Sequence, residues 1–113
     1  EGVKQMIAFL LWSSYPNREF VTRCGLKIPA ALEEMIAKRD YELMYEAGPL
    51  APEEFVDAFA WAGTPEDVAS QIGKIADIGV RRFGCWALVP PGGDLELEIR
   101  LIAEEVIPRV RRR

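Results

Sequence analysis

The chain has 113 residues, with 14 Lys and Arg against 18 Asp and Glu and no histidine, so its formal net charge is −4. This acidic balance argues against a nucleic-acid binder, because such proteins neutralise phosphates with clustered basic residues. Half of the residues are hydrophobic and 28% are charged, as in soluble globular domains. A chain of this length buries enough surface for one modest core, so at most one domain is expected.

The absence of histidine excludes Ser-His-Asp triads, Cys-His pairs and His-ligated zinc within this chain, since imidazole is the usual general base and metal ligand near neutral pH. Cys24 and Cys85 are far apart and form no CxxC pair, so we expect neither a metal site nor a thioredoxin-like redox site. Both thiols are expected to be free and mostly buried, as in a reducing cytosol.

No secretory signal is visible, and the longest early apolar stretch, residues 6–12, is far shorter than the roughly 20 residues of a membrane helix. We therefore expect a cytoplasmic protein with no membrane partner. The chain does not begin with Met, and we expect it to have been processed, trimmed or cut from a longer product.

Helical patterns dominate the first half of the chain. Apolar residues spaced three and four apart predict a helix over residues 3–14. Asn17 is a suitable cap for a short second helix, and Gly25 stands where a glycine ends such a helix. Pro29 suits the first turn of a third helix.

Two further helices are predicted before residue 60. Residues 40–47 form a short helical pattern that is stopped by Gly48 and the following proline. Residues 52–59 begin with proline and two acids, which favours another helix. The alternation of bulky and small side chains over residues 55–61 also allows a strand, and helix is the favoured interpretation.

The clearest element begins at Thr64. A threonine cap, a proline in the first helical position and acids at residues 66–67 predict a helix that ends near Gly79. Gly73 lies inside this helix and indicates a close packing contact, because an interior glycine costs up to about 1 kcal/mol relative to alanine.

A short apolar run at residues 80–89, bounded by glycine and proline, predicts a buried strand. Asp94 then caps a final helix, which Pro108 and a basic end close; that end is Arg109, Arg111, Arg112 and Arg113. A single buried strand cannot pair its own backbone groups, and each unpaired group costs about 1–3 kcal/mol. The partner strands must come from another copy, another polypeptide or an absent part of the gene product.

Three blocks, residues 55–68, 78–83 and 103–108, resemble the carboxy-terminal end of the luciferase-like monooxygenase superfamily. Within it, the likeness is closest to coenzyme F420-dependent methylenetetrahydromethanopterin reductases. The resemblance implies an α/β fold: this chain would be the C-terminal fragment of a (β/α)8 TIM barrel, mostly helical with one strand. A complete barrel takes about 250 residues, so strands one to seven would be missing.

The resemblance also implies that the chain is a single or partial domain with two parts. Residues 1–60 would be the helical connection after strand seven, and residues 61–113 the last helix-strand-helix unit of the barrel. Active sites of such barrels lie in the loops after the strands, and residues 89–94 form that loop here.

Gly92 and Gly93 are the candidate cofactor-binding residues, because paired glycines let the backbone approach a ligand and the following helix N-terminus favours an anion. An ordinary turn capped by Asp94 is the alternative. The start of the helix at Thr64 lacks the glycines and lysine of a phosphate loop. Cys85 and Trp86 are expected to pack on opposite faces of the strand.

The remaining charged residues predict no site. Adjacent acids diverge by about 100° on a helix and are expected to be solvated faces rather than catalytic pairs; they are Glu33, Glu34, Glu53, Glu54, Glu104 and Glu105. The basic end is expected to be a solvated helix terminus, with a phosphate or RNA contact as the alternative.

Two hypotheses for the function follow. In the first, the chain is part of a flavin- or F420-dependent oxidoreductase that transfers a hydride to or from a small organic substrate, with F420 or FMN bound in the complete protein. The catalytic residues would lie elsewhere, and the chain alone would be inactive. In the second, it is a non-catalytic module whose exposed strand drives homo-oligomerisation or binding of a partner.

Overall fold

The computed structural model describes residues 2–89 and 92–112, and in this part the chain is mostly helical and contains no β-strand. It divides into two compact units, residues 1–60 and residues 61–113. Each unit has its own cluster of buried hydrophobic side chains, whereas the length of the chain favoured a single core.

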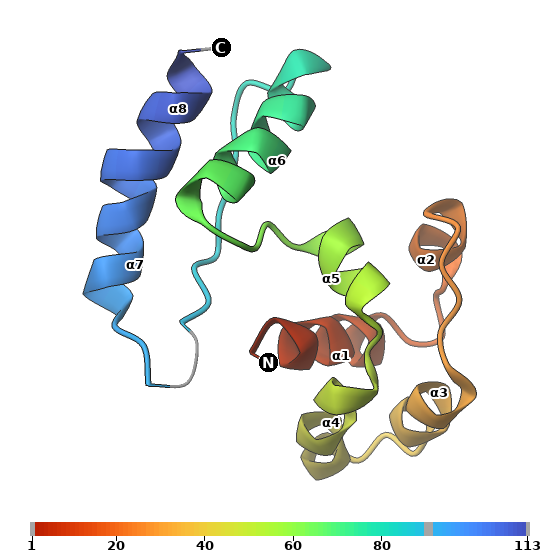
Figure 1. Ribbon diagram of the computed structural model, residues 1–113. Helices are drawn as coiled ribbons and strands as arrows, with labels where there is room; N and C mark the ends of the chain where they lie inside the picture. Colours follow the sequence, from red (N-terminus) through yellow and green to blue (C-terminus); the bar gives the residue numbers. More distant parts are fainter. Residues whose placement is uncertain (1, 90–91, 113) are drawn as a thin grey trace. The chain divides into compact units, whose positions relative to one another are not determined.

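The first unit is a cluster of short helices around α1 (Figure 1). Its elements are α1 (Gly2–Ser14), α2 (Glu19–Arg23), α3 (Ala30–Ala37), α4 (Tyr41–Ala47), the 3-10 turn η1 (Gly48–Leu50) and α5 (Glu53–Phe59). Helix α1 contacts α3, α4, η1 and α5, so its apolar stripe is the centre of the core. Leu11, Leu32 and Phe55 are completely buried there. The predicted helix at residues 52–59 is confirmed against the strand alternative.

Local capping signals set the ends of these helices. Gly25 has a φ of +72°, and its N–H donates to the Thr22 carbonyl at 3.0 Å, as a C-terminal glycine does. The N-cap of α2 is Arg18 and not the predicted Asn17, although the Asn17 side chain accepts from the N–H of Glu19 at 3.0 Å. Pro29 is the N-cap of α3 rather than its first helical residue, because its ψ of 140° is extended.

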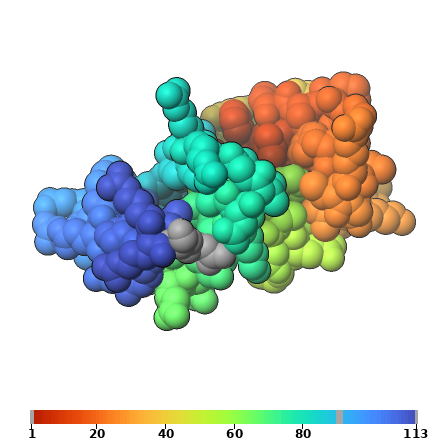
Figure 2. Space-filling model, turned by 90° about the horizontal axis from the view of Figure 1, so that it is seen from above, coloured from red at the N-terminus to blue at the C-terminus, as the bar shows by residue number. Residues whose placement is uncertain are grey.

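The second unit consists of α6 (Pro65–Asp77) and a long terminal helix. The terminal helix is built from α7 (Leu95–Leu101), the π-helical segment η2 (Ile102–Val106) and α8 (Ile107–Arg111). Helix α6 packs along η2 and α8, and Figure 2 shows their atoms side by side in green-teal and blue. The core is small: Ala69, Ile72 and Val106 are buried, with partly buried Trp61, Val68, Phe83 and Val110 around them.

The terminal helix continues past Pro108 and ends at Arg111, within the basic end that the sequence predicted to close it. Proline has no N–H to donate within a helix and its ring clashes with the preceding turn. The π-helical segment immediately before Pro108 shifts the hydrogen-bond register, and the Arg109 guanidinium donates to the Glu105 carbonyl in that turn. The helix therefore continues through Pro108 without a break.

The strand expected at residues 80–89 does not form, so this prediction is wrong for the isolated chain. The whole segment is neither helix nor strand, and the described residues provide no other strand to pair with it. A strand exists only through the hydrogen bonds of a ladder. The apolar pattern is present, but within residues 2–89 and 92–112 it has no partner strand with which to form a sheet.

Candidate cofactor-binding loop

The glycine-rich loop between the apolar segment and α7 contains both candidate cofactor-binding residues. Gly92 has a φ of +76°, a conformation that glycine adopts without steric cost, and Gly92 and Gly93 are both exposed. A Cβ added to Gly92 would meet no atom within 4 Å, so its backbone conformation, and not crowding, requires glycine. The two prolines of the predicted loop, Pro90 and Pro91, lie outside the described residues.

Negative charge surrounds the start of the helix that follows this loop. The Asp94 side chain accepts a hydrogen bond from the N–H of Glu96 at 2.9 Å, which confirms Asp94 as the N-cap of α7. Glu96 and Glu98 lie in the first turn. Glu96 forms an ion pair with Arg100 at 2.8 Å, and the carboxylates of Asp94 and Glu98 add negative charge at this helix N-terminus, which opposes the binding of an anionic group.

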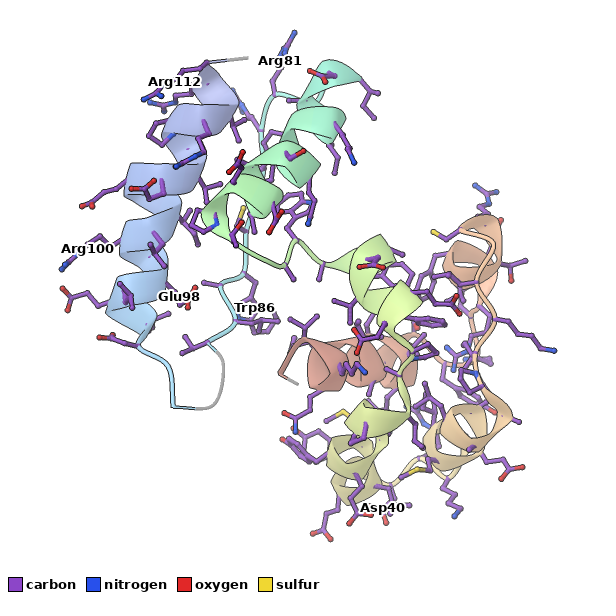
Figure 3. All side chains as sticks on the ribbon, viewed as in Figure 1. Asp40, Arg81, Trp86, Glu98, Arg100 and Arg112 are labelled. Atoms are coloured by element: carbon purple, nitrogen blue, oxygen red, sulfur yellow. The ribbon has the colours of Figure 1, made fainter. Side chains whose placement is uncertain are left out.

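The apolar segment before the loop is only partly covered. Phe83 stacks edge-on against Trp61, with 5.8 Å between the ring centroids, and both side chains pack on the core of the second unit. Trp86 is 76% exposed, and its side chain points away from α7 (Figure 3). Cys85 is exposed as well. The prediction that Cys85 and Trp86 pack on two faces of a strand is therefore wrong here, because no sheet or second layer covers them.

The start of α6 is a structural cap. The Thr64 hydroxyl accepts from the N–H of Asp67 at 3.2 Å, while the Asp67 carboxylate accepts from the Thr64 N–H at 2.9 Å and from its hydroxyl at 2.7 Å. These bonds lower the pKa of the Asp67 carboxyl. Since each group already satisfies the other, this turn has the capping role that the sequence predicted and not that of a phosphate loop.

One acid of each adjacent pair is bound to a basic residue. Ion pairs join Arg18 to Glu33 at 2.9 Å, Lys4 to Glu53 at 2.7 Å and Arg109 to Glu105. No group of three Cys, Asp or Glu side chains within residues 2–89 and 92–112 is arranged to hold a metal ion.

Cys24 and Cys85 are free, but both are exposed, so the expectation of mostly buried thiols is wrong. Cys24 is the C-cap residue of the short helix α2, and its side chain is exposed.

In the described part of the chain, no helix has the length and apolar character needed to cross a membrane.

A row of arginine and aromatic side chains, which was not predicted from the sequence, lies at the end of α1. The Arg39 guanidinium lies 4.3 Å from the centre of the Trp12 ring and 5.3 Å from that of the Tyr15 ring. The Arg18 guanidinium also lies 5.3 Å from the centre of the Tyr15 ring. Arg39 also donates to the Trp12 carbonyl at 2.6 Å. Both arginines thus stabilise the C-terminal end of α1, since Arg18 donates to the Leu11 carbonyl at 2.9 Å.

The position of Arg39 was not predictable from the sequence, because its φ of +58° is a conformation that is typical of glycine. The row continues through α4, where Tyr41 stacks edge-on against Trp12 and its hydroxyl lies 2.9 Å from that of Tyr45. Only the contacts between residues distant in sequence reveal it.

Three archaeal proteins named 5,10-methylenetetrahydromethanopterin reductase are similar to the chain. The relative from Archaeoglobus fulgidus is 29% identical over 112 residues, which covers 94% of this chain and 32% of the relative. The relative from Methanopyrus kandleri is 32% identical over 110 residues, 96% of this chain and 30% of the relative. The relative from Methanolobus tindarius is 34% identical over 82 residues, 70% of this chain and 24% of the relative.

No family model matches the chain, and no solved structure matches it. The chain spans only about a quarter to a third of the length of the curated relatives it matches. It is therefore similar, almost from end to end, to one part of a larger archaeal reductase.

Proposed function

We propose that the chain is part of an F420-dependent reductase that acts on methylenetetrahydromethanopterin. The observation that carries this proposal is the extent of the similarity: two relatives of the same name each align with at least 94% of the chain. A likeness confined to one amphipathic helix would be weaker support, because helical patterns recur in unrelated proteins. Here it includes both units and the segment between α6 and α7.

The proposed fold of the complete protein is the (β/α)8 barrel of the luciferase-like superfamily, with residues 80–89 as a barrel strand. The exposed Trp86 and the unpaired apolar segment support this proposal, since an apolar run of this kind is typical of a strand buried on both faces. The small core of the second unit supports it too. Three buried side chains cannot cover such a segment, whereas neighbouring strands and the rest of the barrel would.

In this proposal Gly92 and Gly93 lie at the carboxyl end of that strand, where barrel enzymes bind their ligands. The carboxylates of Asp94 and Glu98 disfavour a phosphate at this place, so the glycine backbone would face the neutral ring system of the cofactor or the substrate. The coenzyme supplies the hydride, and the protein positions and shields the reacting carbon. The catalytic residues of the complete protein would come from the part outside this chain.

The test is an assay of the complete gene product that contains these residues. We expect methylenetetrahydromethanopterin to be reduced with reduced F420 as the hydride donor, and the 113-residue chain alone to be inactive. Reduced FMN is the matched alternative donor. A complete protein that turns over with FMN alone would refute the F420 assignment, and one that binds neither coenzyme would refute the oxidoreductase proposal.

A non-catalytic role in association is the second candidate, favoured by exposed hydrophobic side chains of the second unit; these are Ile78, Trp86, Leu95, Leu97 and Ile99, each at least 49% exposed. Apolar surface of this kind promotes association. Light scattering over a dilution series of the 113-residue chain tests this role. A dimer or larger species at micromolar concentration is expected, and a strictly monomeric chain would refute association.

A further inference from the structure

We draw no further inference here: the strongest candidate, the row of stacked side chains Arg18, Tyr15, Arg39, Trp12, Tyr41 and Tyr45 across the C-terminal end of α1 and the start of α4, is accounted for by its contacts with itself and with the carbonyls of α1, and nothing in the structure shows what covers its exposed tyrosines.

Discussion

Replacing Trp86 by alanine should affect the isolated chain and the complete protein to very different extents. In the isolated chain Trp86 is 76% exposed, so about a quarter of its surface is buried. An aromatic side chain buries about 200 Å² when fully covered, and burial contributes about 25 cal/mol per Å². The substitution should therefore cost about 1 kcal/mol at most. In a barrel strand, with the indole packed on all sides, the same change should cost about 3–5 kcal/mol.

The assay compares urea unfolding of the wild-type and Trp86→Ala proteins, once in the 113-residue chain and once in the complete gene product. Hydrogen exchange at residues 84–89 should accompany it, because ladder hydrogen bonds protect backbone amides. We expect fast exchange in the isolated chain and slow exchange in the complete protein. Trp61→Ala is the matched control: Trp61 already packs on Phe83 and the core of the second unit, so its loss should destabilise both proteins.

Two outcomes would refute this reasoning. A loss of several kcal/mol on Trp86→Ala in the isolated, monomeric chain would mean that the indole is already buried there. Fast exchange at residues 84–89 in the complete protein, with a small effect of the substitution, would mean that no strand forms and that the barrel assignment is wrong.

Three further predictions concern the chain itself. Thr64→Ala should lower stability by about 1 kcal/mol through loss of the cap, seen as a lower urea midpoint at unchanged slope. Because the Thr64 hydroxyl lowers the pKa of the Asp67 carboxyl, the part of this contribution that comes from its bond to the carboxylate is present at neutral pH and is lost as the pH falls through the folded-state pKa; an equal difference in acid would contradict it. Gly48→Ala should lower the stability by about 1–3 kcal/mol, since the added Cβ would lie 2.9 Å from the Cγ of Gln5 in α1 and 3.3 Å from the Gln5 backbone. An unchanged melting temperature would disprove this contact. Cys24 and Cys85 should both react with a thiol reagent without denaturant, and protection of either would contradict its exposure.

Features determined by neighbouring residues were predicted well from the sequence. The cap at Thr64, the cap at Asp94 and the glycine end at Gly25 all depend on side chains and dihedral angles within a few residues of one another. The glycines of the candidate loop were also recognisable, and Gly92 does adopt the positive φ for which glycine is suited. Their contact with a cofactor stays a prediction, because it depends on a ligand and on protein segments beyond the chain.

Features that depend on distant residues were not predictable. Arg39 has a positive φ that its contacts with Trp12 and Tyr15 hold in place, and no residue close in sequence signals this. A non-glycine residue in this region costs about 1–2 kcal/mol, which tertiary contacts must offset.

The missing strand at residues 80–89 also depends on distant residues, and it bears on the proposed function. Their sequence is that of a buried strand, yet a strand is a property of a sheet and cannot be formed by one segment alone. The second unit anchors the segment at Phe83 and leaves Trp86 exposed, while three buried side chains make up its core. Relatives that contain a similar segment are three to four times as long as the part aligned with this chain. Under the proposed function, neighbouring strands of the complete reductase would pair with this segment and cover Trp86.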